Sequence, residues 1–519
     1  MAPDGKTLYG ASPWSRCWLE GAGAGVLVAL PLLWLELNPG RQTHYHELLP
    51  MNSVYQGLLI DLVVCIGCSV LLLWLLERGD RSHRSLGWAL LLALLAVRVV
   101  RGLLIATVIS PRVADTRLIF LVAAFAGLVL WIAERSWYSW MVRGARTTLL
   151  LLGFSIFWIG PELVVMAFQA EPREAAGFKR LAAQSASRRI VWILFDEASY
   201  DQLFDHPQPD AKYPNFNRLA SGSLLFTDVQ PAGYFTERVV PSLLEGETVT
   251  EEKSDLQGRL FVKTRENPHW RLYPDRRTLF ADAQREGWST GVVGWYNPYC
   301  RTEAAELDDC YWTLTTPLPG RYSQDGTAWC NAVAPLGKSI SRLFGQHVQD
   351  PAAWQMHAAD YEALMAHVAP EIAGDGIGFL FLHLPVPHPG GFYSRKTGQI
   401  GVDGSYLDNL ALTDATLGEL LREIDGSTLG SRTTVIVSSD HSWRVALWQP
   451  TTDWRPEDTR VSGGRFDSRP LLLVHFPGES TPIRVNQSFP LIRIHGMIEG
   501  MLAGRIGDPA ELGAWAAQP

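Results

Sequence analysis

The chain has 519 residues, and its 53 acidic side chains outnumber its 45 basic ones to give a formal net charge of -8. This balance, with no run of basic residues in the second half, argues against a nucleic-acid partner. Five long apolar segments lie in the first third of the chain, and the remainder has an ordinary globular composition. Length and composition together indicate a membrane part followed by a separate globular domain.

Each of the five apolar segments is long enough for a helix to cross ~30 Å of hydrocarbon. No small-residue cleavage site follows the first, so we interpret it as a retained anchor rather than a secretory signal. Lys and Arg are concentrated in the N-terminal segment and in the loops expected on the same side of the membrane, which places the N-terminus in the cytoplasm. We therefore expect residues 1–170 to form a five-helix transmembrane domain in an inner or plasma membrane, with the next domain periplasmic or extracellular. The expected spans lie near residues 17–37, 55–76, 87–109, 117–133 and 147–168.

Residues 171–188 are expected to connect the membrane part to the exported domain. Phe178 beside Lys179 and Arg180 is typical of a helix lying on the membrane surface, and a solvated linker fits the same residues. We place the exported domain at residues 189–519.

Three of the six cysteines lie in this exported domain, where an oxidising compartment favours disulfides. Their spacing is compatible with a Cys300–Cys310 bridge that leaves Cys330 over. Three free thiols are the alternative.

Two apolar runs in the exported domain end in side chains that bind metals. The run IVWILF precedes Asp196 and Glu197, and the run TVIVSS precedes Asp440 and His441. Unbroken apolar runs are typical of parallel strands covered by helices on both faces, and open α/β sheets carry their chemistry at the carboxyl ends of such strands. The pattern predicts an α/β fold with a doubly wound sheet.

A threonine hydroxyl is placed to act as a nucleophile beside these ligands. Thr236 precedes ERVVPSLLEG, which predicts a helix, and the N-terminal end of a helix suits phosphate binding. A threonine hydroxyl needs a base or a cation against its oxygen, and a divalent metal supplies that cation. Glu, Asp and His ligands suit zinc or manganese better than magnesium or calcium. Taken alone, Asp440-His441 also fits a strand-end loop with a structural histidine.

The order of these motifs resembles the alkaline phosphatase superfamily, in its sulfatase-like and phosphoethanolamine or phosphoglycerol transferase branches. DEASYDQL, YPNFNRLA, FTDVQ, TERVVPSLLEG, HLPVPHPGGFY and SSDHS follow one another in the family's order over about residues 188–500. The resemblance implies an alkaline-phosphatase/sulfatase-like domain with Thr236 as nucleophile. It further implies a metal site made of Asp196, Glu197, Thr236, Asp440 and His441.

The nucleophile motif favours phosphoryl over sulfate chemistry. Formylglycine sulfatases carry C-x-P-S-R or its serine version at this place, and the chain has neither. Thr236 lies five residues before Pro241, as the nucleophile does in the transferases, whereas Ser242 belongs to the body of the predicted helix.

Substrate contacts are expected from two histidines and an arginine. His383 and His388 match a pair that in the transferases binds substrate phosphate or a second metal, although His383 lies inside a strand and fits a core histidine equally well. Ser442 replaces the family's glycine, and no later His-Gly follows within thirty residues. We therefore expect Arg444 to supply the positive charge there.

Ionisable residues also occur inside the predicted spans. Asp61, Arg101 and Glu162 lie at a similar depth in three spans, and Arg98 is one turn deeper. Such charges are costly and normally pair. The group is either a structural ion-pair cluster or a site where the arginines receive a lipid phosphate.

These features predict a membrane-anchored, metal-dependent phosphoryl transferase. It would move a phospholipid headgroup of the phosphoethanolamine or phosphoglycerol type to an envelope glycan or lipid through a phospho-threonine intermediate. The alternatives are a sulfatase-like phosphodiesterase or other hydrolase, and a degenerate protein that only binds glycans.

Overall fold

The structure, a computed structural model, forms two compact units in this chain. It describes all residues except 1–12, 37–51, 81–82, 90, 93–123, 125–126, 129–134, 170–176, 181–185, 209–211, 256–257, 275–277, 316–326, 334–352 and 519. The first unit contains most of the N-terminal third together with residues 322–343, and the second contains the rest of the C-terminal part.

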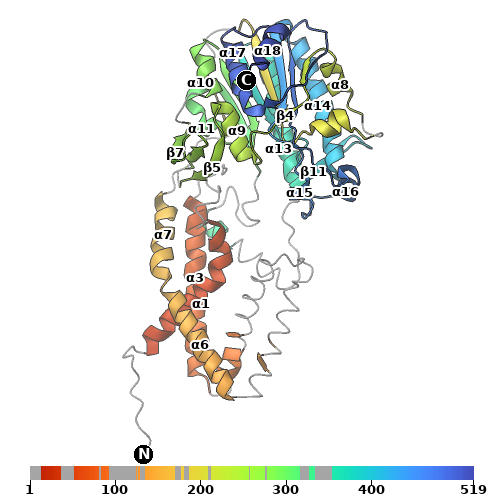
Figure 1. Ribbon diagram of the computed structural model, residues 1–519. Helices are drawn as coiled ribbons and strands as arrows, with labels where there is room; N and C mark the ends of the chain where they lie inside the picture. The colour runs from red at the N-terminus through yellow and green to blue at the C-terminus, as the bar shows by residue number, and fades with distance from the viewer. Residues whose placement is uncertain are drawn as a thin grey trace, which may run out of the picture. The chain divides into compact units, whose positions relative to one another are not determined.

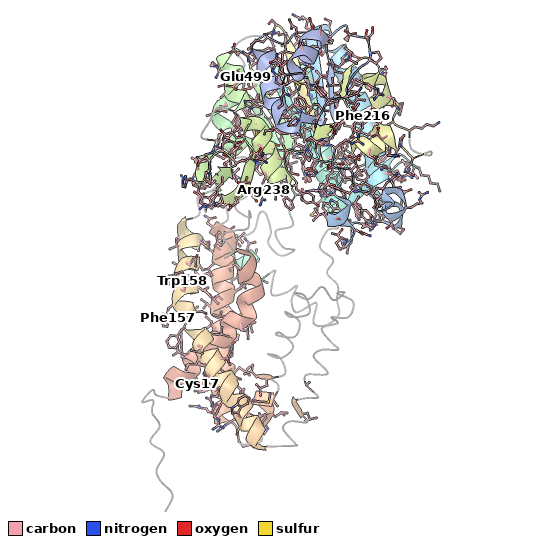
Figure 2. The ribbon with its side chains drawn as sticks, viewed as in Figure 1. Cys17, Phe157, Trp158, Phe216, Arg238 and Glu499 are labelled. Atoms are coloured by element: carbon pink, nitrogen blue, oxygen red, sulfur yellow. A yellow bond between two sulfur atoms is a disulfide. The ribbon has the colours of Figure 1, made fainter. Side chains whose placement is uncertain are left out.

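Long apolar helices build the first unit. They are α1 (Pro13–Glu36), α3 (Asn52–Arg78), α6 (Arg135–Gly153) and α7 (Ile156–Gln169). Glycines allow α1 and α6 to approach closely, because a side chain at Gly23 or Gly153 would collide with the backbone of the facing helix. Many large apolar side chains remain exposed on this unit, among them Phe157 and Trp158 (Figure 2).

Two of the five predicted spans are helices long and apolar enough to cross a membrane. They are Asn52–Arg78 and Tyr138–Phe168, of 27 and 31 residues, the second running through α6 and α7. The first predicted span lies in α1, whose described apolar part, Cys17–Ala29, is shorter. The spans predicted at 87–109 and 117–133 lie mostly outside the described residues. The described part of the chain therefore has two candidate spans rather than five.

The charges predicted to cluster inside these spans are not brought together in the described residues. Asp61 is buried on α3 and neither of its carboxylate oxygens has a hydrogen-bond partner, while Glu162 is exposed on α7. Arg98 and Arg101 lie outside the described residues. A different ion pair joins the helices: Arg146 lies 3.1 Å from the buried Glu20 carboxylate and 2.9 Å from Glu77.

The second unit is built on a nine-stranded mixed sheet with the order β1-β9-β8-β10-β2-β13-β14-β3-β15. The five strands from β9 to β13 run parallel, and the strands beyond them include antiparallel neighbours. Every residue of the central strand β2 is buried, as its apolar sequence from Ile190 to Phe195 predicts. The strands are β1 (Gly177–Lys179), β2 (Arg189–Phe195), β3 (Leu224–Phe226), β8 (Thr290–Trp295), β9 (Asp309–Thr313), β10 (Phe379–Leu384), β13 (Thr433–Ser439), β14 (Leu472–His475) and β15 (Ile483–Val485).

Helices cover both faces of this sheet, so the predicted doubly wound α/β architecture is confirmed (Figure 1). On one face α13 and α14 contact each other and α14 contacts α8; on the other α9, α10 and α17 are neighbours. A side sheet of β5 (Val249–Ser254), β6 (Leu260–Thr264) and β7 (Arg271–Tyr273) follows α9. The helices are α8 (Pro214–Ala220), α9 (Thr236–Glu245), α10 (Leu279–Arg285), α13 (Ala353–Ala373), α14 (Tyr406–Gly426) and α17 (Ile494–Leu502).

The connection was predicted as a surface helix or a solvated linker, and the part of it that the structure describes contains a strand. Gly177–Lys179 pairs antiparallel with β9, with Phe178 opposite Cys310. Phe178 rests against the core of the sheet, which explains why the segment extends the sheet rather than coiling.

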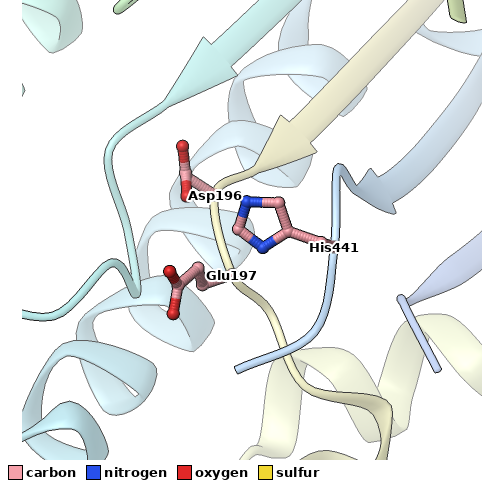
Figure 3. Close-up of side chains that lie close together, drawn as sticks. All are labelled: Asp196, Glu197 and His441. Carbon is pink, nitrogen blue, oxygen red and sulfur yellow. The ribbon is translucent and has the colours of Figure 1, made fainter. Parts of the chain in front are cut away.

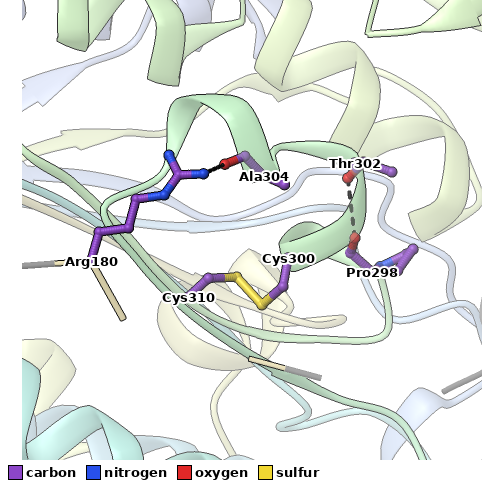
Figure 4. The surroundings of a disulfide bond; sticks show 6 residues. All are labelled: Arg180, Pro298, Cys300, Thr302, Ala304 and Cys310. Atoms are coloured by element: carbon purple, nitrogen blue, oxygen red, sulfur yellow. Dashed lines mark hydrogen bonds between the residues drawn. A yellow bond between two sulfur atoms is a disulfide. The ribbon is translucent and has the colours of Figure 1, made fainter. Parts of the chain in front are cut away.

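The predicted disulfide is confirmed. Cys300 and Cys310 are bonded and tie the short helix α11 (Tyr299–Thr302) to β9 (Figure 4). Cys330 is free and exposed, as the prediction of a single bridge requires.

Candidate active site

The carboxyl ends of two adjacent parallel strands bring the predicted ligands together. Phe195 at the end of β2 is paired with Ser439 at the end of β13. The next residues, Asp196 and His441 among them, therefore meet at one edge of the sheet, where Figure 3 shows the Asp196, Glu197 and His441 side chains converging.

Thr236 is the first residue of α9 and points into this group. Its Oγ1 lies 2.7 Å from Asp440 Oδ2, 3.2 Å from His441 Nε2 and 3.3 Å from Asp196 Oδ2. The hydroxyl is buried at the positive end of the helix, where backbone N–H groups face an anion. Ser242 lies in the body of α9, where its hydroxyl donates to Arg238 O and accepts from Val249 N.

The donor set fits a divalent cation. Ligand atoms of Asp196, Glu197 and His441 all lie within 4.8 Å of one another, and Asp440 Oδ2 is 2.9 Å from His441 Nε2. Asp196 Oδ1 and His383 Nε2 are buried without a hydrogen-bond partner. Buried polar atoms are normally satisfied, so unpaired oxygen and nitrogen atoms at one point indicate a site for a metal.

Within this cluster, interactions between charged groups shift the pKa values in the direction opposite to the effect of burial. Burial alone would raise the pKa of Asp440, but His441 beside it holds that pKa below the usual range. Burial likewise lowers the pKa of His441, and the facing Asp440 carboxylate more than offsets this effect. The pair is thus stabilised as an ion pair in the absence of another cation.

Glu197 differs from Asp196 because its carboxylate is already occupied. Arg444 Nε donates to Glu197 Oε1 at 2.5 Å, and Trp448 Nε1 donates to the same oxygen at 2.8 Å. Burial raises the pKa of Glu197, and Arg444 opposes that shift. The backbone of Glu197 is in the left-handed region, with φ 66°, and its N–H donates to Asp440 Oδ1. The free oxygen of Asp196 makes it the better ligand, and Glu197 fixes Arg444 in the site.

The two predicted histidines line the same region. His383 Nδ1 is 2.7 Å from the Tyr299 hydroxyl, and its Nε2 is 3.6 Å from Asp196 Oδ2. His388 is enclosed by rings, with Trp295 and Trp448 5.1 and 4.9 Å away between centroids. Burial lowers the pKa of His388 to about 3, so this imidazole is neutral at physiological pH.

Several side chains near the site were not singled out from the sequence. Tyr296, which follows β8, has φ 70°, and its hydroxyl donates to Glu237, the residue after Thr236. Strained backbone of this kind clusters at functional sites. Trp448 contacts Glu197, and His357 lies 5.0 Å from His388 between ring centroids. No local motif marks these residues, although Tyr296 lies in an aromatic-rich stretch, GWYNPYC.

A buried site suited to a cation lies beside the hydroxyl of Thr236, at the carboxyl edge of a doubly wound sheet. This arrangement is typical of enzymes that act on phosphate or sulfate esters. Residues 188–462 match the model of the Sulfatase family, a span of more than half of the chain. The protein belongs to this family and is an enzyme of the alkaline phosphatase superfamily.

Other comparisons gave distant matches. A search of the curated proteins matched nothing. Among solved structures, a phosphonate monoester hydrolase of Agrobacterium radiobacter matches with a TM-score of 0.40 and 14% identity, over 61% of this chain and 73% of that one. A sulfatase from Pseudoalteromonas sp. matches with 0.40 and 15%, over 62% and 68%. Murine ectonucleotide pyrophosphatase/phosphodiesterase 5, an inactive form with AMP, matches with 0.34 and 12%, over 62% and 96%.

Proposed function

We propose that the protein is a membrane-anchored phosphoryl transferase that moves a phosphoethanolamine- or phosphoglycerol-type headgroup from a phospholipid to an envelope glycan or lipid. The observation that carries the proposal is the position of Thr236 Oγ1, within 3.3 Å of two carboxylates and an imidazole at the start of α9. The residue type favours phosphoryl transfer, since the site holds threonine where a formylglycine sulfatase needs cysteine or serine.

The reaction takes place in two displacements. Thr236 Oγ1 loses its proton and bonds to the phosphorus of the donor as the bond to the diglyceride oxygen breaks, and that oxygen takes up a proton. An acceptor hydroxyl then bonds to the same phosphorus and loses its proton, and Thr236 leaves again as the free hydroxyl. Each displacement leaves one phosphodiester, so charge balances throughout.

Asp196, Asp440 and His441, with Thr236, would hold zinc or manganese. When bound, such a metal supplies the Lewis acidity that lowers the pKa of the threonine hydroxyl. Arg444 provides a second, permanent cation for the phosphoryl oxygens. Glu197, which also accepts a hydrogen bond from Trp448, fixes its direction. The neutral His388 is suited to contact the leaving or attacking oxygen without adding charge.

The membrane part supports a lipid donor. Two candidate spans are described, and we extend this to the five-span, multi-pass arrangement predicted from the sequence, with the catalytic unit on the periplasmic or extracellular side. In that arrangement the donor is an abundant lipid of the same membrane.

Intact-mass spectrometry tests the proposal. The purified protein is incubated with phospholipid vesicles and zinc or manganese, beside Thr236→Ala and the hydroxyl-retaining control Thr236→Ser. We expect an adduct of phosphoethanolamine or phosphoglycerol mass in the wild type that Thr236→Ala lacks.

The other outcomes select the alternatives. No adduct, with a soluble phosphodiester still cleaved, would contradict transfer and identify a hydrolase. Neither adduct nor cleavage with either metal would contradict catalysis and favour a protein that only binds glycans.

A further inference from the structure

A helical turn from the second half of the sequence belongs to the membrane unit. Residues 327–333 lie in sequence between β9 and α13 of the catalytic unit, yet they are part of the first unit. The turn is closed by Asn331 N–H donating to Thr327 O, and Cys330 N–H donates to Thr327 Oγ1.

This turn is built into the N-terminal end of α3. Asn331 and Ala332 are buried, and the Asn331 amide donates to the hydroxyl of Ser53. A Cβ on Gly57 would lie 2.8 Å from Asn331 Cβ and 2.9 Å from its carbonyl carbon, so the close approach depends on glycine. This close contact fixes the turn at one position along the axis of α3.

If α3 crosses a bilayer, this position along the helix lies at the membrane–water interface. Ser53 and Gly57 lie in the first two turns of the 27-residue helix, about 6 Å apart along its axis. The polar layer on each side of a bilayer is roughly 5–7 Å deep. The turn therefore lies where headgroups meet the acyl chains.

The surface that the turn leaves exposed matches this layer. Trp329 is 65% exposed and Val333 is 48% exposed, and their spacing of four places them on one side of the turn. Tryptophan is enriched at membrane–water interfaces because its ring is amphipathic. The same unit also exposes Val63 and Leu71 further along α3, as expected of a helix that contacts lipid.

We propose that residues 327–333 form an interfacial anchor, in which Trp329 and Val333 insert among the lipids around the N-terminal end of α3. The anchor gives the catalytic part of the chain an attachment to the bilayer in addition to the one after α7. The proposal depends on α3 crossing a membrane and not on the chemistry at Thr236.

Cys330 provides the probe for a test in the full-length protein. The other free cysteines, Cys17, Cys65 and Cys68, are replaced by serine, and Cys330 is labelled with an environment-sensitive fluorophore. The protein is placed in nanodiscs of phosphatidylethanolamine and phosphatidylglycerol with quenching groups at the headgroup, carbon 5 or carbon 12. A label on Lys396→Cys, in the same background with Cys330→Ser, is the water-exposed control.

We expect quenching at Cys330 that is severalfold stronger from the headgroup and carbon 5 than from carbon 12, with little quenching at the control site. Gly57→Leu should displace the turn and remove the quenching, and Trp329→Asn should weaken it without disturbing α3. A Cys330 label as accessible to aqueous iodide as the control label would overturn the proposal. Quenching unchanged in both variants would overturn the role of the docked turn.

Discussion

Arg444 and Glu197 form a buried ion pair whose members have different roles in the site. The Glu197 carboxylate is fully buried, and its cation is Arg444, which also donates to Tyr234 O. Removing one partner of such a pair leaves an uncompensated buried charge, which costs about 3–5 kcal/mol. Replacing both partners by neutral groups removes most of that cost.

We therefore expect Arg444→Met to lose stability by about 3–5 kcal/mol, and Glu197→Gln/Arg444→Met to recover much of it. Both variants should lose phosphodiester cleavage by about 10²-fold or more, since the fixed cation is gone in each. Thermal unfolding and kcat/KM on a soluble phosphodiester measure the two effects separately. Arg460→Met, which removes an exposed side chain that pairs with Glu457, is the control and should change neither. Recovery of activity in the double variant would show that Arg444 is only structural.

Glu303 predicts how stability depends on pH. It is 1% exposed, so its carboxyl group is almost entirely removed from water. Burial, with Glu306 close by, raises the pKa of Glu303 to about 8. The folded state thus keeps a proton that the unfolded state releases above its ordinary pKa of about 4.5.

Between these two values unfolding releases a proton, so this residue lowers stability as pH rises to about 8, by up to about 5 kcal/mol. We expect Glu303→Gln to unfold at a higher temperature than the wild type at pH 8.5 and to differ little from it at pH 5. The comparison is a series of thermal unfolding curves at several pH values. The exposed Glu266→Gln should follow the wild type, and a Glu303→Gln curve parallel to it would refute the expectation.

The sequence identified which residues meet at the site, but it did not identify all of the contacts that they make there. Asp196, Thr236, Asp440 and His441 were named because a strand end and a helix start fix where their side chains lie. The pairing of Glu197 with Arg444 and Trp448 depends on a left-handed backbone at Glu197, for which a non-glycine sequence gives no signal.

At the scale of elements, the disulfide fastens α11 to β9 beside the site. Both cysteines are buried, and the bridge closes a loop with a sequence separation of 10. A loop of that length corresponds to about 3 kcal/mol in the chain-entropy account.

We expect Cys300→Ala/Cys310→Ala to lose about 3 kcal/mol of stability, because the unfolded chain is no longer constrained. Denaturant unfolding of the catalytic unit, followed by tryptophan fluorescence, measures the loss. The matched control is Cys330→Ala, which removes an exposed free thiol and should leave the midpoint unchanged. Equal midpoints for all three proteins would contradict a stabilising bridge.

Elements were predictable from sequence where their pattern was long and uninterrupted. β2 is almost wholly apolar, β13 has the β-branched core Val-Ile-Val, and α14 carries a Ser405 capping box at its start. β8 was not predicted from the sequence, because TGVVGW contains two glycines and lies among aromatic, glycine and proline residues. β1 has three residues and exists only through its pairing with β9, which no local pattern encodes.

At the scale of the whole molecule, each of the two units has its own dense set of internal contacts, which indicates that the catalytic unit can fold without the membrane helices. In the proposed function, the first unit would act mainly by keeping the enzyme at the lipid surface, where the local concentration of donor is high. Loss of such tethering reduces the rate on a surface-bound substrate without altering the site.

We expect a fragment of residues 177–519, which keeps β1, to cleave a soluble phosphodiester with kcat/KM close to that of the full chain. Its rate on phospholipid vesicles should fall by about 10²-fold, because the fragment must reach the surface by diffusion. Parallel assays on both substrates, with Thr236→Ala in each protein as the blank, make the comparison. Equal losses on both substrates would show that the membrane helices are needed to form the active site itself.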